Sequence, residues 1–205
     1  MKNTSIGSWI TLNSCSVAEI MASSGFDWLC VDMEHSVTDY KDVQLLIATI
    51  QSKGLKAFVR VGENNTRIIK RVLDAGADGI IVPMVNTKAD AQKAVAAANY
   101  PPVGKRGVGL ARAQGYGFGF DEYKDKKAKE ILLIAQIEHV DAVRNLEDIL
   151  SVEGIHGTLV GPYDLSGSMG KPGGYDDADV KQVLDKYETT ANNYDKLIGF
   201  HVIQP

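Results

Sequence analysis

The sequence predicts an α/β fold of the (β/α)8 TIM barrel class, built as one domain over residues 1–205. Apolar runs of strand length alternate with amphipathic segments at intervals of roughly 20 to 30 residues, which is the pattern of repeated βα units in a parallel sheet. Charged and polar residues follow several of these runs directly, where the loops of such a barrel build an active site. With 205 residues, 44% of them hydrophobic, the chain can form one substantial core.

Three predicted strands, each followed by a helix, occupy the first part of the chain. The strands are SIGSWITL, WLCVDM and KAFVRV, and the helices run from Ser16 to about Ser24, from Thr38 to Lys53 and from about Thr66 to Asp74. The second helix carries four apolar residues on one face: Val43, Leu46, Ile47 and Ile50. Gly76 is expected to end the third helix as its C-terminal cap.

Four more predicted strands follow, GIIVPMV, ILLIAQIE, HGTLVGP and LIGFHVIQ. Thr87, with Asp90 three residues later, resembles a capping box for the helix after the first of these strands. The eighth strand and helix of a barrel are missing from the sequence, which stops at Pro205 directly after a predicted strand and would leave an unpaired sheet edge. We therefore expect a barrel that is truncated at its C-terminus.

Composition and charge exclude several classes of partner. The formal net charge of -4 comes from interspersed acidic and basic residues, so a nucleic-acid partner is not expected. No apolar stretch approaches the roughly 18 residues of a membrane span, and the N-terminus lacks a long apolar signal core. Two cysteines, one of them in a predicted buried strand, favour a reducing cytoplasm over a disulfide framework.

The segment from Tyr100 to about Glu130 is too long for an ordinary connection. Its glycines lack the lysine and Ser/Thr of a phosphate-binding P-loop, so nucleotide binding is not expected. Tyr116, Phe118 and Phe120 suit a cleft wall or contact with another subunit, although a purely structural flap explains them equally well. Three cationic residues are candidates to meet anionic substrate groups: Lys105, Arg106 and Arg112.

A first chemical cluster lies at the ends of the second and third predicted strands. Asp32 and His35 are spaced so that a carboxylate can orient an imidazole and raise its basicity, as a general base requires. The alternative is a histidine that merely caps a loop. Arg60 ends the third strand between apolar neighbours, where its charge is costly unless it faces an anion or a polar cavity. Glu34 is interpreted as a supporting or helix-start residue.

A second cluster follows the fifth and sixth predicted strands. Gln136, Glu138 and Asp164 are polar residues at or just beyond two strand ends that we expect to be adjacent. Two carboxylates without thiolates or clustered histidines suit an ion that prefers oxygen ligands, such as Mg²⁺ or Mn²⁺, although a proton-sharing acid/base pair is also compatible with the spacing. Gly161 would let the backbone bring N–H groups close to a substrate carboxylate.

These motifs together resemble the HpcH/HpaI aldolases, which are metal-dependent class II pyruvate aldolases. The resemblance covers about residues 6–205 and is carried by DMEH at 32–35, Arg60, RGVGLARAQGYG at 106–117, AQIEH at 135–139 and LVGPYDLSGSMG at 159–170. The five motifs occur in the family's order and at its spacing. What departs from the family pattern is the C-terminus, because family members continue for several dozen residues beyond HVIQP.

The resemblance implies a homohexameric barrel that binds a divalent metal ion, Mg²⁺, Mn²⁺ or Co²⁺. It implies that the enzyme cleaves 4-hydroxy-2-oxo acids into pyruvate and an aldehyde, or forms these acids from the two products. The reaction would pass through a metal-bound pyruvate enolate. The implied roles are metal binding by Glu138 and Asp164, enolate stabilisation by Arg60, and proton transfer by His35 oriented by Asp32. Substrate binding is implied for a further set that overlaps these: Arg60, Gln136, Gly161, Pro162 and Asp164.

Two other functions are compatible with the sequence. A citrate-lyase-like or phosphoenolpyruvate-mutase-like carbon–carbon lyase could use the same carboxylates and arginine. A non-catalytic barrel subunit is the remaining possibility, motivated by the missing eighth unit. The aldehyde partner stays open, since succinic semialdehyde, tartronate semialdehyde, lactaldehyde and glycolaldehyde are all chemically admissible.

Overall fold

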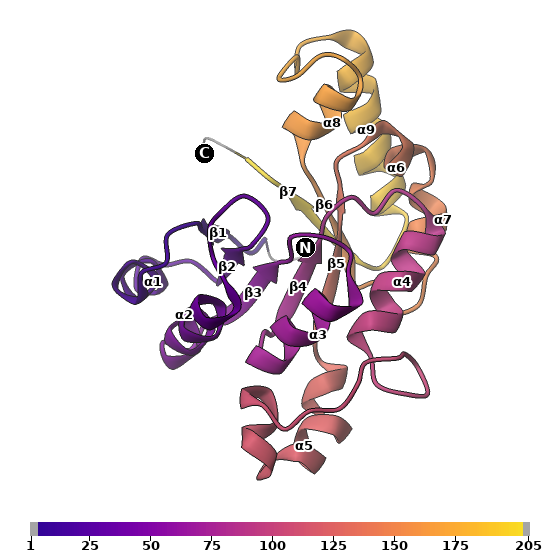
Figure 1. Ribbon diagram of the computed structural model, residues 1–205. Coiled ribbons are helices and arrows are strands. Elements are labelled where there is room, and N and C mark those ends of the chain that lie inside the picture. Colours follow the sequence, from indigo (N-terminus) through magenta and orange to yellow (C-terminus); the bar gives the residue numbers. More distant parts are fainter. Residues whose placement is uncertain (1–3, 203–205) are drawn as a thin grey trace. The chain divides into compact units, whose positions relative to one another are not determined.

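The computed structural model describes residues 4–202 and contains a parallel α/β fold. Its seven strands follow one another in the sheet in their sequence order, β1 to β7 (Figure 1). The chain forms two compact units. The first comprises the residues up to Ile80 together with Ala96–Leu132, and the second comprises Ile81–Val95 and the residues from Leu133 onward. Strand β4 (Gly79–Val82) and helix α4 (Lys88–Ala98) each cross from one unit to the other.

The first unit contains the elements β1 (Gly7–Ile10), α1 (Cys15–Ala22), β2 (Trp28–Asp32), α2 (Tyr40–Ser52), β3 (Lys56–Arg60), α3 (Thr66–Ala75), η1 (Arg112–Gly117), α5 (Phe120–Asp125) and η2 (Lys127–Lys129). Helices α1, α2 and α3 pack side by side next to the strands (Figure 1). Strands β2 and β3 are parallel, and their register sets Asp32 opposite Arg60. Two predicted functional residues are therefore neighbours because of strand pairing.

Local sequence signals fix the helices of this unit. Helix α2 begins after Asp39, which forms a capping box with Asp42, and it buries the four predicted apolar residues. Helix α3 begins after Asn65, whose side chain accepts hydrogen bonds from two backbone N–H groups, and it ends at Gly76 with φ of 102°. The predicted glycine cap is confirmed, since this positive φ is unfavourable for any residue with a Cβ.

The second unit contains β5 (Leu132–Ile137) after its first residue, and then α6 (Val140–Arg144), α7 (Leu146–Leu150), β6 (Gly157–Val160), α8 (Pro162–Ser168), α9 (Ala178–Asn192) and β7 (Leu197–Phe200). Strands β5, β6 and β7 are parallel, with Ile137 opposite Val160 and Val160 opposite Phe200. At the start of α4, Thr87 and Asp90 exchange hydrogen bonds through their side chains and backbone N–H groups, which confirms the predicted capping box.

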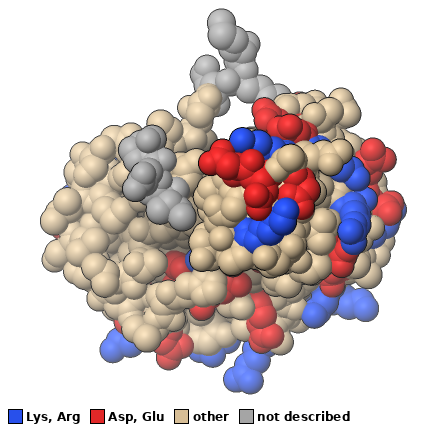
Figure 2. All heavy atoms as spheres, turned by 90° about the horizontal axis from the view of Figure 1, so that it is seen from above, with Lys and Arg blue, Asp and Glu red and all other residues tan. Residues whose placement is uncertain are grey.

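Burial along the strands agrees with a parallel sheet covered by helices. All four residues of β4 are buried, and so are all four of β6, whereas β7 is half-exposed along its length. The seven predicted strands are confirmed, and the missing eighth unit stays a prediction. Among the described residues, no helix combines the length and the apolar character that crossing a bilayer requires. The face seen in Figure 2 carries interspersed acidic and basic side chains.

Candidate active site

The first cluster is a buried ion pair at the carboxyl ends of β2 and β3. Arg60 donates from Nε to Oδ1 of Asp32 at 2.8 Å and from a terminal nitrogen to Oδ2 at 2.6 Å. This is a bidentate pair, in which the planar guanidinium matches the carboxylate at both oxygens. Asp32 is 1% exposed and Arg60 7% exposed. Each charge therefore depends on the other for compensation inside the protein.

Two further side chains complete the surroundings of Arg60. Its second terminal nitrogen lies 3.3 Å from Oε2 of Glu34, and its guanidinium carbon lies 4.5 Å from the centre of the Trp9 ring. Glu34 therefore contacts the arginine directly, as a supporting residue would. Trp9 comes from β1 and adds a cation–π contact. The guanidinium is held between two carboxylates and an indole ring.

The same contacts keep both members of the pair charged. Burial by itself would raise the pKa of Asp32, but the hydrogen bond and the charge of Arg60 outweigh it, so the pKa is lowered. For Arg60, burial would lower the pKa, but the hydrogen bond and charge of Asp32 outweigh it, so the pKa is raised. Arg60 therefore stays protonated, and the register of β2 and β3 fixes its position.

His35 is placed differently from the prediction. The carboxylate of Asp32 accepts the backbone N–H of His35 at 3.4 Å and that of Glu34 at 3.0 Å, and its remaining capacity is used by Arg60. The imidazole is 67% exposed, and its Nε2 lies 3.8 Å from Oε2 of Glu34. The expected hydrogen bond from Asp32 to the imidazole is therefore wrong. Asp32 orients the loop that carries His35, and Glu34 is the carboxylate beside the ring.

The second cluster is built around the buried carboxylate of Glu138, which follows β5. The side-chain amide of Gln136 donates to Oε2, and the backbone N–H of Met84 donates to Oε1 at 2.7 Å. Glu138 is 4% exposed. Both of its oxygens are thus oriented by a donor, which is what a buried carboxylate requires.

Gly161 lies directly beside this carboxylate, at the end of β6. A Cβ on Gly161 would stand 3.5 Å from Cβ of Glu138 and 3.8 Å from its Oε2. The N–H of Gly161 donates to the carbonyl of Ile137 at 3.0 Å. The N–H of Gly161 itself is therefore used by the sheet, and the approach of other N–H groups of this segment to a substrate carboxylate stays a prediction. What glycine provides here is open space next to Glu138.

Asp164 lies in the first turn of α8, which Pro162 begins. Its side chain is exposed and makes no hydrogen bond or ion pair with the described residues. Asp164 is three residues after Gly161, a rise of about 4.5 Å along a helix. The predicted pairing of Asp164 with Glu138 around one ion stays a prediction.

The residues around Glu138 fit a divalent ion in their chemistry. Within residues 4–202, no group of three or more His, Cys, Asp or Glu side chains is arranged to hold a metal ion. Mg²⁺ does not need such a group, because it is often held by one or two carboxylates together with water and substrate oxygens. Gln136 is a second observation that fits a site for an ion with water or substrate, since its Oε1 is buried beside Glu138 without a hydrogen-bond partner. This oxygen is free to accept from a water molecule or a substrate hydroxyl.

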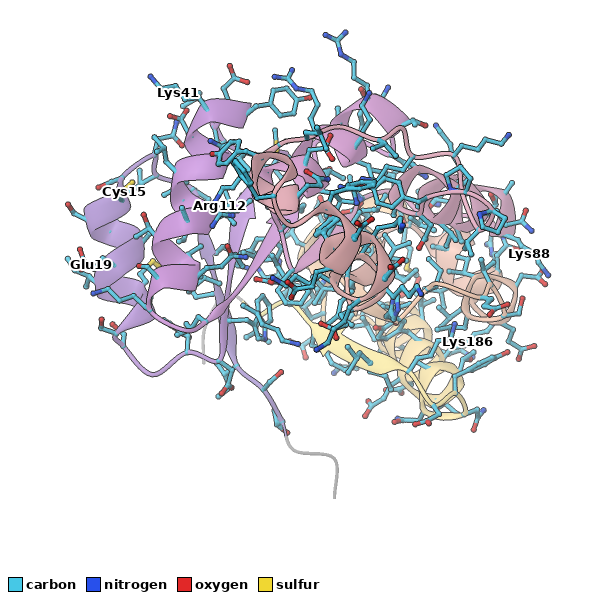
Figure 3. The ribbon with its side chains drawn as sticks, turned by 90° about the horizontal axis from the view of Figure 1, so that it is seen from below. Cys15, Glu19, Lys41, Lys88, Arg112 and Lys186 are labelled. Carbon is cyan, nitrogen blue, oxygen red and sulfur yellow. The ribbon has the colours of Figure 1, made fainter. Side chains whose placement is uncertain are left out.

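Two of the three candidate cations of the long segment are not presented as predicted, whereas Lys105 is exposed. The side chain of Arg106 is fully buried, donates to Asp74 at 2.7 Å and to the Tyr123 hydroxyl at 3.0 Å, and lies near the Tyr100 ring. Arg112, labelled in Figure 3, donates to Gln51 on α2 and to the carbonyl of Ala75. These two arginines attach the segment to α2 and α3. The expectation that they meet substrate is therefore wrong.

A cavity of about 530 Å³ in the first unit lies at the amino end of β3. Lys56, the first residue of that strand, lines it together with Arg112 and Asp78. Arg60 is the last residue of the same strand. The cavity therefore lies at the end of the strand opposite to the predicted catalytic residues.

The similarity of the whole chain to known proteins decides its family. Residues 5–199 match the family described as HpcH/HpaI aldolase/citrate lyase. The chain belongs to this family. It is accordingly a carbon–carbon lyase, and the alternative of a non-catalytic subunit is not supported.

Individual family members are similar over nearly the full chain. The 2-keto-3-deoxy-L-rhamnonate aldolase of Klebsiella pneumoniae is 37% identical over 203 residues, which are 98% of this chain and 76% of that enzyme. A crystal structure of an HpcH/HpaI aldolase/citrate lyase family protein from Burkholderia cenocepacia has a TM-score of 0.90 at 33% identity, covering 95% of this chain and 78% of that one. A citrate synthase structure has a TM-score of 0.86 at 28% identity, covering 98% and 78%. The resemblance stated from the sequence motifs is confirmed.

Proposed function

We propose that this protein is a metal-dependent aldolase that cleaves 2-keto-3-deoxy sugar acids, a group of 4-hydroxy-2-oxo acids, into pyruvate and an aldehyde. The observation that carries the proposal is the Glu138 carboxylate, buried and held at both oxygens by Gln136 and Met84. Relatives named 2-keto-3-deoxy-L-rhamnonate aldolase support the substrate class. For that acid, the aldehyde product is lactaldehyde, because carbons 4 to 6 leave together.

The reaction breaks the bond between C3 and C4. The C4 hydroxyl loses its proton and becomes the aldehyde carbonyl, and the bonding electron pair passes to C3 and on to the C2 oxygen. The pyruvate enolate then takes up a proton at C3. A catalyst must therefore remove one proton, return one proton and stabilise the negative charge that develops on the C2 oxygen.

Glu138 and Asp164 would hold the divalent ion, Mg²⁺, Mn²⁺ or Co²⁺, which supplies positive charge to the keto oxygen and carboxylate of the substrate. The clamped geometry of Glu138 would reduce the reorganisation needed on binding. Gly161 and Pro162 would form the adjacent wall, with no side chain on Gly161 to obstruct the keto acid. Gln136 would orient the substrate through its unpartnered Oε1, which can accept from a hydroxyl group.

We propose that Arg60 and His35 serve the same substrate. Arg60 would stabilise the developing enolate oxygen, and its pair with Asp32 would fix the plane of the guanidinium. His35 would take the C4 hydroxyl proton as the general base of the reaction. Glu34, beside both groups, would stabilise the protonated ring.

The test is the release of pyruvate from a panel of 4-hydroxy-2-oxo acids, measured with and without a chelator. We expect release to stop after thorough metal removal and to return with Mg²⁺ or Mn²⁺. Glu138→Gln and Asp164→Asn should each abolish release while leaving thermal unfolding cooperative. Asp185→Asn is the matched control, because Asp185 is an exposed carboxylate in the middle of α9. Release that is unaffected by the chelator would refute the metal-dependent mechanism.

A citrate-lyase-like reaction is the second candidate, because the family description includes citrate lyase and a citrate synthase is among the similar structures. Such an enzyme would form or break a carbon–carbon bond between oxaloacetate and an acetyl donor. Incubation with oxaloacetate and acetyl-CoA separates the candidates. Citrate formation without any cleavage of 4-hydroxy-2-oxo acids would favour the second.

A further inference from the structure

We propose that Met84 is a positioning residue whose left-handed backbone conformation aims a fixed N–H group at the metal ligand Glu138. The inference rests on the proposed role of Glu138 in metal binding. Met84 has φ of 52°, and among the described residues only one other residue that is not glycine, Tyr116, has a positive φ. A methionine in this region carries a steric cost.

Packing of the Met84 side chain does not explain this conformation. Met84 follows β4 and Pro83 and is 51% exposed, whereas Pro83 and Val85 on either side are buried. The cost of the positive φ is therefore not offset by burying the thioether. A strained residue at a functional site persists only where the surrounding structure determines its conformation.

The surrounding contacts hold the backbone in place on both sides of Met84. The chain enters through the buried end of β4, and it leaves through Asn86, whose N–H donates to Asp90 at 3.2 Å. The carbonyl of Asn86 accepts from the side chain of Asn145 at 2.9 Å. Between these anchors, the left-handed turn at Met84 brings its N–H within 2.7 Å of Oε1 of Glu138.

A backbone donor gives Glu138 an orientation that a side-chain donor alone does not. The amide of Gln136 can rotate about its side-chain bonds, whereas the N–H of Met84 is fixed by the peptide plane. With Oε1 held by Met84 and Oε2 by Gln136, the carboxylate has one defined plane before any ligand binds. Groups that orient a metal ligand commonly change metal affinity by about 10- to 100-fold when they are removed.

The inference predicts an unusual order among substitutions at position 84. Glycine and asparagine adopt positive φ readily, so Met84→Gly and Met84→Asn should keep the N–H in place and hold the Mn²⁺ dissociation constant within about threefold. Valine and isoleucine are strongly disfavoured at positive φ, so Met84→Val and Met84→Ile should weaken Mn²⁺ binding on the order of tenfold. A role for the thioether itself predicts the reverse order, with glycine the most harmful.

The experiment measures Mn²⁺ affinity of the full chain by calorimetry or electron paramagnetic resonance, with thermal unfolding in chelator as the check on folding. Tyr116→Gly and Tyr116→Val are the matched controls, because Tyr116 also has positive φ but its N–H donates to Ala111. We expect these controls to change thermal stability and leave Mn²⁺ affinity unchanged.

The outcomes separate this inference from the proposed function. The inference is supported if Mn²⁺ affinity is kept in the variants whose residue at position 84 adopts positive φ readily and is lost in the others. It is overturned if the valine and glycine variants bind Mn²⁺ equally well, or if only Met84→Gly loses much of its Mn²⁺ affinity. If Met84→Val fails to fold, Met84→Ile and Met84→Asn supply the same comparison. If Glu138→Gln binds Mn²⁺ as tightly as the unaltered protein, the metal role of Glu138 is wrong, and the inference is overturned with it.

Discussion

Replacing Arg60 by alanine tests the buried ion pair and the chemistry together. The substitution leaves the carboxylate of Asp32, which is 1% exposed, without its bidentate partner. Removing one partner of a buried pair costs about 3–5 kcal/mol, because the other charge is left uncompensated. At about 2–4 °C per kcal/mol for a domain of this size, the melting temperature should fall by about 6 to 20 °C.

The same substitution should lower turnover by about 10²- to 10³-fold, the scale for losing one group that stabilises an oxyanion. The double variant Arg60→Ala with Asp32→Asn separates the two effects. It also removes the charge of Asp32, so it should recover much of the lost stability without recovering turnover. Thermal unfolding followed by circular dichroism and pyruvate release measure the two quantities.

Two results would refute this reasoning about Arg60. If the single variant has the same melting temperature as the unaltered protein, the buried charge of Asp32 does not depend on Arg60 for compensation. If the double variant regains turnover together with stability, Arg60 acts only as the structural partner of Asp32. Arg144→Ala is the control, because Arg144 is 67% exposed and pairs with Asp141 at the surface. Such an exposed pair contributes little to stability, about 0–1 kcal/mol.

Two further predictions concern stability. The pKa of Asp32 is lower in the folded state than its ordinary value, so the stability that Asp32 contributes is present above about pH 4 and is lost as the pH falls through the folded pKa. The difference in the free energy of unfolding between the unaltered protein and Asp32→Asn should therefore shrink below about pH 4 in an acid titration. A difference that grows below this pH would contradict the predicted direction. Gly76→Ala should destabilise by more than Gly25→Ala: both glycines have positive φ, but a Cβ at Gly76 would stand 2.5 Å from the guanidinium of Arg112, whereas a Cβ at Gly25 meets nothing within 4 Å. Equal losses in chemical denaturation would show that the arginine moves aside freely.

Much of the fold could be predicted from the sequence because its signals are local. The alternation of apolar runs with amphipathic segments located the seven strands, and Gly76 and the Thr87–Asp90 pair marked helix ends through contacts within a few residues. The placement of polar residues after the strands identified Asp32, Arg60 and Glu138 as candidates. Parallel strand pairing places Asp32 opposite Arg60.

The sequence could not decide which partner each polar side chain takes. Asp32 has His35 three residues away in the chain, yet its carboxylate binds Arg60, because the register of β2 and β3 brings a guanidinium to both of its oxygens. Arg106 resembles a cation available to substrate, yet it is buried against Asp74, 32 residues earlier. Distant pairing of this kind depends on how helices pack on strands, and neither periodicity nor spacing encodes it directly.

Met84 shows most clearly what could not be predicted from the sequence. In the sequence it is one apolar residue at the end of a strand run, VPMV, with no sign of chemistry. Its positive φ and its N–H contact with Glu138, 54 residues later, exist only in the folded chain. The sequence by itself determined the order of the elements, the family and the residue types at the strand ends. The tertiary structure decided their partners, because hydrogen-bond geometry and backbone strain are set by long-range contacts.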